Sequence, residues 1–178
     1  MRIISGKNKG KRINVPKKLP IRPTTDQSKE AIFNIIQNRY NFESIKVLDL
    51  YAGSGNISYE FSSRGVDHIT SIDNNHKCVN FIKSISNDLN LNINVKKTDV
   101  FKFLKTNTLS YDVIFCDPPY DYSIGNYTEI QNLIFNNNTL NIDGIFILEH
   151  SKKIKLNSID NFKESREYGG CSFSFFYL

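Results

Sequence analysis

The chain has 178 residues and a net charge of +5, a length that fits one domain with a core of its own. Its three cysteines, Cys78, Cys116 and Cys171, are an odd and sparse set that argues against a disulfide framework, and no CxxC pair indicates a zinc site. No apolar run approaches the ~18 residues that a membrane-spanning helix needs. We therefore expect a soluble, cytoplasmic protein with reduced thiols and no bound metal.

The first 25 residues carry most of the positive charge. They contain eight Lys and Arg residues and no acid, whereas the rest of the chain holds 15 basic and 18 acidic residues. Short β-favouring pieces at residues 2–4 and 12–15 flank a turn region rich in Gly, Lys and Asn, which predicts a small hairpin. Such an arm is typical of a protein that binds a polyanion, although a solvated tail has the same composition. We expect the arm, residues 1–20, to be a unit separate from a main domain, residues 21–178, whose sheet folds without it.

A helix is predicted to follow the arm. Three prolines between residues 16 and 23 indicate an extended connector. Thr24 and Gln27 then have the spacing of a capping box, and Ile32, Ile35 and Ile36 form an apolar stripe at helical spacing. The helix is therefore expected over residues 23–36.

From residue 46 onward, strands alternate with helices. This rhythm predicts a mostly parallel sheet covered by helices on both faces, and in such sheets ligands bind beyond the carboxyl ends of the strands. Strands are expected over residues 46–51, 69–73, 93–97, 111–117 and 144–150, helices over 57–65, 76–89, 100–105 and 127–135, and further β structure in the tail, 169–178.

Residues 48–56, LDLYAGSGN, end the first of these strands with a glycine-rich turn. Gly53 and Gly55 would let the backbone approach a ligand closely and expose its amide N–H groups. The dinucleotide pattern GxGxxG is not met, because its sixth position here is Ser58. Asp49 would repel a pyrophosphate but can attract an ammonium group, directly or through water. Taken alone, the turn can also be purely structural.

Two more acids follow the next strands. Asp73 ends the second strand, where an acid can accept hydrogen bonds from both hydroxyls of a ribose or can cap the following helix. Asp99 follows the third strand and can accept from an exocyclic adenine N–H or cap the helix over residues 100–105. The sequence leaves both pairs of roles open.

The fourth strand runs directly into Asp117-Pro118-Pro119-Tyr120. An exocyclic amine on a nucleobase is a poor nucleophile, because its lone pair is delocalised into the ring. The Asp117 carboxylate and the Pro118 carbonyl can accept its two hydrogens, and the fixed φ of proline helps to aim that carbonyl. Tyr120 offers a ring on which a base that has left its stack can lie. This arrangement would point the nitrogen lone pair at a bound methyl donor.

These motifs together resemble the RsmD family of S-adenosylmethionine-dependent methyltransferases. The segments RIISGKNKGKRINVP, RPTTDQSKEAIFNII, LDLYAGSGN and DPPY occur in the family's order, and the resemblance extends from Arg2 to about Glu149. It implies methylation of N2 of a guanine in 16S ribosomal RNA, as naked RNA or within an assembled or assembling small subunit, by a monomer. It also implies a Rossmann-like class I methyltransferase fold with seven mostly parallel strands. The residues after the second glycine, Asn56, Ile57 and Ser58, differ from the family's usual pattern.

The resemblance also assigns site residues. The expected catalytic residues are Asp117, Pro118, Pro119 and Tyr120. S-adenosylmethionine contacts are expected at Asp49, Ala52, Gly53, Gly55, Asp73, Asn74, Asp99, Val100 and Asp117. RNA contacts are expected at Arg2, Lys7, Lys9, Lys11, Arg12, Arg22, Thr24 and Thr25. No metal ligand is expected.

Other functions share parts of this pattern. A DNA adenine-N6 methyltransferase can use the same DPPY, but such enzymes normally carry a recognition domain for which 178 residues leave little room. Methylation of a protein glutamine amide usually requires Asn in place of Asp117. A non-catalytic RNA-binding assembly factor could keep the fold, although the complete DPPY and glycine turn argue against it. His150, at the end of the fifth strand, is expected to be a structural partner.

Overall fold

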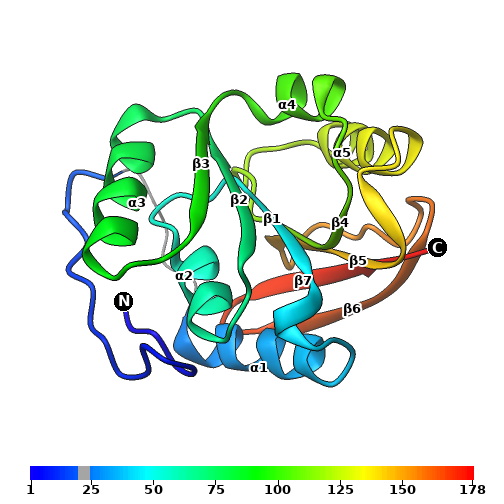
Figure 1. Ribbon diagram of the computed structural model, residues 1–178. Helices are drawn as coiled ribbons and strands as arrows, with labels where there is room; N and C mark the ends of the chain where they lie inside the picture. Colours follow the sequence, from blue (N-terminus) through cyan, green and yellow to red (C-terminus); the bar gives the residue numbers. More distant parts are fainter. Residues whose placement is uncertain (20–24) are drawn as a thin grey trace.

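The computed structural model describes residues 1–19 and 25–178. Within them, seven strands form one sheet in the order β3-β2-β1-β4-β5-β7-β6 (Figure 1). The five neighbouring strands β3, β2, β1, β4 and β5 are parallel to one another, whereas β7 runs antiparallel to both of its neighbours, β5 and β6. The expected fold class is thereby confirmed. The strands are β1 Lys46–Leu50, β2 His68–Asp73, β3 Ile93–Lys97, β4 Tyr111–Cys116, β5 Leu140–Ser151, β6 Phe162–Tyr168 and β7 Cys171–Phe176.

Helices cover both faces of the sheet. In Figure 1, α4 and α5 lie above the sheet and α1 lies below it. The helices are α1 Asp26–Gln37, α2 Asn56–Ser63, α3 His76–Asp88, α4 Val100–Thr106 and α5 Ile124–Asn136, with a short 3-10 helix at Phe42–Ser44.

Two separate cores follow from the alternation of side chains along the strands. On β4, Val113 and Phe115 pack in the cluster that contains α1 and α2, whereas Ile114 and Cys116 pack in the cluster that contains α4 and α5. All four are buried. The continuous apolar run of this strand is therefore explained by burial on both faces, which leaves polar residues for its carboxyl end.

The N-cap of α1 lies one residue later than predicted. Its N-cap is Thr25, whose side chain accepts a hydrogen bond from the Ser28 backbone N–H. The expected capping box of Thr24 and Gln27 is therefore wrong in register, and Thr24 itself lies outside the described residues. β6 was not predicted, because this edge strand is mostly exposed and carries no apolar run.

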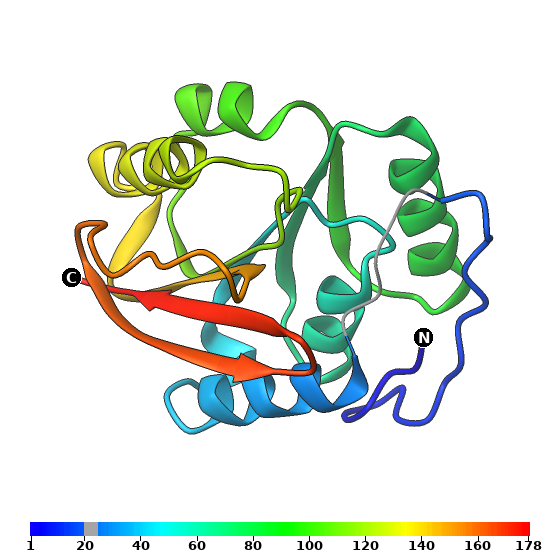
Figure 2. The same cartoon turned by 180° about the vertical axis from the view of Figure 1, so that it is seen from behind.

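The N-terminal arm turns back on itself as expected, with an isolated antiparallel bridge between Arg2 and Arg12. It is also part of the folded body, because Ile3 and Ile13 are buried in a third core cluster with side chains of α2 and α3. Figures 1 and 2 show this segment running along the outside of the molecule near α3 and α1. The arm therefore packs onto the main body, and folding of the sheet without the arm stays a prediction.

Among the described residues, no helix combines the length and the apolar character needed to cross a membrane.

Candidate active site

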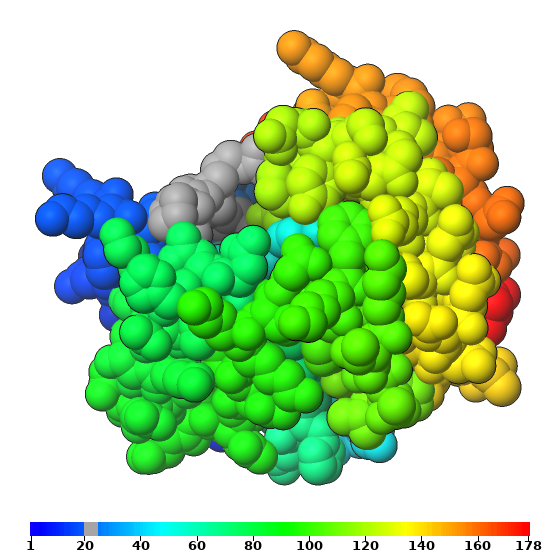
Figure 3. All heavy atoms as spheres, turned by 90° about the horizontal axis from the view of Figure 1, so that it is seen from above, coloured from blue at the N-terminus to red at the C-terminus, as the bar shows by residue number. Residues whose placement is uncertain are grey.

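A cavity of about 370 Å³ opens at the carboxyl ends of β1, β2 and β4. That volume is within the range of small-molecule sites. The loops that form it leave the same edge of the sheet (Figure 2), and Figure 3 shows the cyan chain that follows β1 inside a hollow bordered by green and yellow-green segments. Three segments supply most of the lining, namely Ala52, Gly53 and Ser54 after β1, Asp73, Asn74 and Asn75 after β2, and Asp117, Pro118, Pro119 and Tyr120 after β4.

Asp49 is a buried carboxyl group in the wall of this cavity. Its Oδ2 atom accepts a hydrogen bond of 2.5 Å from the Ser58 hydroxyl, which also lies 2.6 Å from the Ser71 hydroxyl. Burial raises the pKa of Asp49 to about 7, although the hydrogen bonds from Ser58 oppose this shift. Among the described residues, this carboxyl group has no positive partner, and a cation in the cavity would stabilise its ionised form.

Asp73 ties two of the lining segments together. Its Oδ2 accepts from the Gly53 backbone N–H at 2.8 Å, and its Oδ1 accepts from the Asn75 N–H at 2.8 Å. The N-cap of α3 is Asn75 rather than Asp73. Of the two roles left open by the sequence, the capping role is therefore excluded, and burial raises the pKa of this carboxyl group.

The DPPY segment is held by both neighbours of β4. The Asp117 backbone N–H donates to the Leu50 carbonyl at 3.3 Å, Pro118 is buried, and Asp117 is partly buried. The Tyr120 hydroxyl donates to Oε1 of Glu149 at 3.2 Å. Glu149 lies on β5 and is itself buried, so the ring of Tyr120 is oriented by a residue that sequence reasoning missed.

A pair of tyrosines completes the lining and was also missed. The hydroxyls of Tyr51 and Tyr122 lie 3.2 Å apart, and their rings meet edge to face with centroids 5.9 Å apart. Tyr51 has a φ of 58°, which is uncommon for a bulky side chain. The unusual backbone conformation directly follows β1, where the chain turns toward the cavity. The position of Tyr51, between the first strand and its glycine-rich turn, is the sequence signal that could have identified it as a lining residue.

Three predicted cofactor residues lie outside this lining: Gly55, Asp99 and Val100. Gly55 has a φ of 80°, and a Cβ there would lie 2.7 Å from Cζ of Tyr59, so glycine is needed for packing. The Asp99 side chain caps α4 by accepting from the Lys102 N–H at 3.0 Å. His150 is a structural partner as expected, since its Nε2 lies 2.8 Å from the Ser174 hydroxyl.

The basic residues of the arm are exposed in the described structure. Lys7 and Lys9 belong to a turn that packs on the last residue of α2, where the Lys7 N–H donates to the Ser63 carbonyl at 2.7 Å. Arg2 forms an exposed ion pair of 3.2 Å with Asp26. Lys11 and Arg12 are exposed too, Thr25 serves as the cap of α1, and the predicted contacts Arg22 and Thr24 lie outside the described residues.

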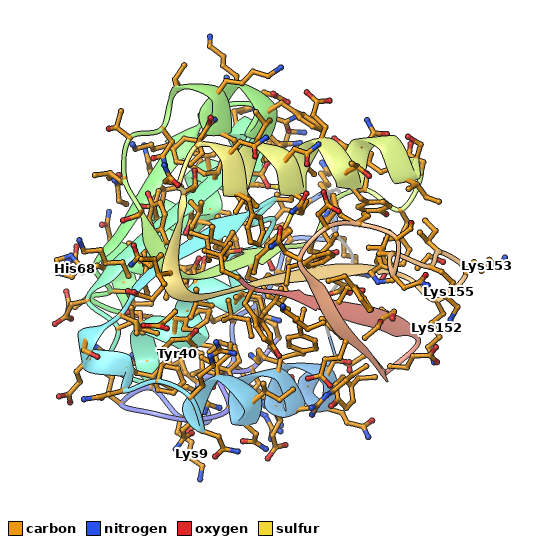
Figure 4. All side chains as sticks on the ribbon, turned by 90° about the vertical axis from the view of Figure 1, so that its right-hand side faces the viewer. Lys9, Tyr40, His68, Lys152, Lys153 and Lys155 are labelled. Carbon is orange, nitrogen blue, oxygen red and sulfur yellow. The ribbon has the colours of Figure 1, made fainter. Side chains whose placement is uncertain are left out.

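A second group of basic side chains follows β5. Lys152, Lys153 and Lys155 are exposed and project from one side of the molecule, away from Lys9 (Figure 4). Lys152 also forms an ion pair of 3.2 Å with Glu167. Sequence reasoning missed this group, although the run SKKIK was visible as a cluster of charge.

The described residues contain no cluster of His, Cys, Asp and Glu that could hold a metal ion. Cys78 lines the cavity, but burial raises the pKa of its thiol to about 11, so the nucleophilic thiolate is disfavoured.

Comparisons with known proteins support one family. The family model described as "Conserved hypothetical protein 95" matches residues 1–177. Ribosomal RNA small subunit methyltransferase D of Buchnera aphidicola subsp. Baizongia pistaciae is 32% identical over 155 residues, which cover 86% of this chain and 78% of that protein. The protein of the same name from Escherichia coli K12 is 29% identical over 150 residues, covering 84% and 74%.

Solved structures support the fold. A hypothetical protein of Thermus thermophilus superposes with a TM-score of 0.86 at 24% identity, covering 100% of this chain and 99% of the other. The 16S rRNA N2 methyltransferase RsmC of T. thermophilus, in complex with AdoMet and guanosine, gives a TM-score of 0.70 at 18% identity, covering 89% and 45%. The family model, which spans nearly the whole sequence, and the relative that is 32% identical show that the chain belongs to the conserved hypothetical protein 95 family, the RsmD family that its motifs resemble.

Proposed function

We propose that this protein transfers a methyl group from S-adenosylmethionine to the exocyclic N2 of a guanine in 16S ribosomal RNA. Its family and its relatives named ribosomal RNA small subunit methyltransferase D support the coarser statement, a methyltransferase that acts on ribosomal RNA. The observation that carries the reaction is that Asp117, Pro118 and Tyr120 line the same cavity as Asp49 and Asp73. The resemblance makes guanine 966 the expected nucleotide.

The residues of the cavity fit S-adenosylmethionine. Asp49 is a buried carboxyl group to which no described residue supplies a positive partner, and the amino-acid end of the cofactor carries an ammonium group. Asp73 lines the cavity beside Gly53 and can accept from ribose hydroxyls. When bound, the cofactor supplies an electrophilic methyl group on its sulfonium.

The DPPY segment would position the amine. Asp117 and the Pro118 carbonyl accept its two hydrogens, and the Tyr120 ring supports the base by stacking, an interaction worth ~1–3 kcal/mol. Positioning of the two reacting groups is the main source of rate, an effect that can supply ~7–11 kcal/mol in favourable cases. The proton of the methylated amine then passes to Asp117 or to water.

Guanine suits this arrangement better than adenine. The Watson–Crick edge of guanine presents donors at N1 and N2, and an ionised carboxylate only accepts. Asp117 therefore matches both donors at once. Adenine presents an acceptor at N1, which a carboxylate would repel.

RNA binding is proposed for the exposed basic residues of the arm. Lys7, Lys9, Lys11 and Arg12 can contact phosphates. The group after β5, Lys152, Lys153 and Lys155, adds a second basic surface. Action as a monomer in the cytoplasm remains part of this proposal.

Nucleoside analysis after methylation in vitro tests the proposal. The purified protein is incubated with S-adenosylmethionine carrying a labelled methyl group and with 16S RNA, free or in small subunits from a strain that lacks the gene. We expect label in N2-methylguanosine. Label in N6-methyladenosine would support the adenine alternative instead, and no label with either substrate would support a non-catalytic assembly factor.

A further inference from the structure

A buried cation lies behind the cavity and has no part in the mechanism described so far. The side chain of Lys29, on α1, has 0% exposure. Its Nζ atom donates to the Arg2 carbonyl at 2.6 Å and to Oδ1 of Asn56 at 2.9 Å, and it lies 3.1 Å from Oε2 of Glu60. Three acceptors surround the nitrogen, which matches the three donors of an ammonium group.

This contact fixes the orientation of the Asn56 amide. An ammonium group donates but cannot accept, so the Asn56 atom that faces Lys29 is the carbonyl oxygen. The amide nitrogen, Nδ2, therefore points elsewhere. Asn56 lines the cavity with 9% exposure, and no described residue accepts a hydrogen bond from its Nδ2. Two N–H donors are thus available to an acceptor in the cavity.

The charge around Asn56 also favours an anion. Glu60 pairs with Lys29 and with Arg64, whose Nε lies 2.9 Å from Oε1 of Glu60, so this buried group has one positive charge in excess. Asn56 is also the first residue of α2, where the backbone N–H groups of a helix and its dipole attract negative charge. The free amide donors, the excess positive charge and the helix N-terminus therefore all favour a negatively charged acceptor at this end of the cavity.

We propose that Asn56, positioned by Lys29, binds the carboxylate of the cofactor's amino-acid end. Asp49 lines the same cavity and is bonded to Ser58, two residues beyond Asn56 on α2, so an acceptor for the ammonium group and a donor for the carboxylate lie on neighbouring segments. The two groups of an amino acid are adjacent and would be bound by this pair. The identity of the ligand rests on the proposed function.

Two forms of the cofactor test the contact. S-adenosylmethionine and decarboxylated S-adenosylmethionine differ only in the carboxylate. The affinity for the first divided by the affinity for the second therefore measures how strongly the protein binds the carboxylate. We expect Asn56→Ala to lower the affinity for S-adenosylmethionine by about 10-fold to 100-fold, the scale for a hydrogen bond to a charged group. The affinity for the decarboxylated form should change by less than about 3-fold. Asn56→Asp, which replaces the donors by acceptors at the same size, should reduce the ratio further.

Matched variants complete the experiment. Gln37→Ala removes an exposed amide that accepts from Arg64 at 3.2 Å but does not line the cavity, and it should leave the ratio unchanged. Lys29→Gln should lower the ratio, whereas Lys29→Arg, which keeps a cation and its donors, should restore part of it. Unfolding curves establish that each variant is folded, and the Asn56 variants decide the carboxylate contact without any change at Lys29.

The possible failures are distinguishable. Equal losses for both forms of the cofactor, or no loss in Asn56→Ala, would overturn the carboxylate contact while leaving the proposed function intact. An unchanged ratio in folded Lys29→Gln would overturn the positioning role of Lys29. If the unaltered protein bound neither form, the proposed function itself would fail.

Discussion

Asp117 is the side chain on which methyl transfer should depend most directly. Asp117→Ala removes an acceptor for the amine, so we expect single-turnover methylation to fall by more than ~100-fold, while calorimetry shows cofactor affinity within a few fold. Asp121→Ala is the matched control, because Asp121 is an exposed acid just beyond Tyr120 that does not line the cavity. Near-normal turnover in Asp117→Ala would refute the proposed mechanism.

Asp49 should make cofactor binding depend on pH. Its pKa in the free protein is about 7, so below that pH an ammonium group can bind only if the carboxyl group releases its proton. Affinity should therefore rise with pH, by up to ~10-fold per unit, and level off above pH 7. Asp49→Asn should bind more weakly and lose this dependence. Calorimetry at several pH values makes the measurement, and a wild-type affinity that is constant between pH 5.5 and 7 would contradict it.

The raised pKa of Asp49 should also make the stability of the fold depend on pH. The pKa of Asp49 is raised from 3.8 to about 7 on folding, so the folded state retains this proton at pH values where the unfolded chain has lost it. The contribution of Asp49 to stability is present below about pH 4 and is lost as the pH rises to about 7. Asp49→Asn should remove that decline, which unfolding curves at pH 5 and pH 7 would detect.

At the scale of elements, a buried ion cluster joins the arm, α1 and α2. Glu60 accepts from the Ile4 and Ser5 backbone N–H groups at 2.8 and 3.0 Å, in addition to its contacts with Lys29 and Arg64. Glu60→Gln would leave two buried cations without a counter-charge. We expect a loss of ~3–5 kcal/mol in the free energy of unfolding, measured in urea.

A surface pair provides the control for this prediction. Glu129 forms an ion pair of 3.3 Å with Lys105, and both side chains are about half exposed. Glu129→Gln should cost less than ~1 kcal/mol, because solvent screens the pair. Equal effects of the two substitutions would mean that the buried cluster contributes no more than an exposed pair.

The elements that position the site could be predicted because their signals are local. The apolar run of β4 and the prolines after it specify a buried strand that ends abruptly, and Gly53 and Gly55 specify the turn after β1. β6 could not be found in this way, because its position is set by pairing with β7 rather than by its own pattern. The cap of α1 was likewise predicted at Thr24, one residue before the observed N-cap, Thr25, because both residues are threonines that can cap a helix.

Contacts between residues that lie far apart in the chain could not be predicted from the sequence. Nothing local relates Tyr120 to Glu149 or Lys29 to Asn56, because each pair meets only when separate elements pack. The positions of the acids at the ends of β1, β2 and β4 were predictable. The hydrogen bond from the Gly53 N–H to Asp73, which fixes the turn after β1, was not.

At the scale of the whole molecule, the arm contributes to both packing and charge. Its deletion would expose the third core cluster, where Ile3 and Ile13 are buried, so a truncation cannot separate RNA binding from folding. Replacing the exposed charges leaves the core intact. The two roles of the arm are therefore best separated by neutralising its lysines.

The double variant Lys7→Gln, Lys9→Gln tests the arm as an RNA-binding surface. Each lost phosphate contact should lower the salt slope of binding by ~0.7–0.9, so we expect a decrease of ~1.4–1.8 if both lysines contact phosphate. The control is Lys102→Gln, Lys105→Gln on α4, which covers the other face of the sheet. An unchanged slope in the arm variant would identify the basic run as a solvated segment.

The central claim, methylation of a guanine N2 that depends on the DPPY segment, is tested most directly in cells. The measurement is mass spectrometry of 16S ribosomal RNA from a strain that lacks the gene and carries either the unaltered protein or Asp117→Ala. N2-methylguanosine at one position should be absent in the strain without the gene, restored by the unaltered protein and absent again with Asp117→Ala. An unchanged set of methylated guanosines in the strain without the gene, or restoration by Asp117→Ala, would contradict the claim.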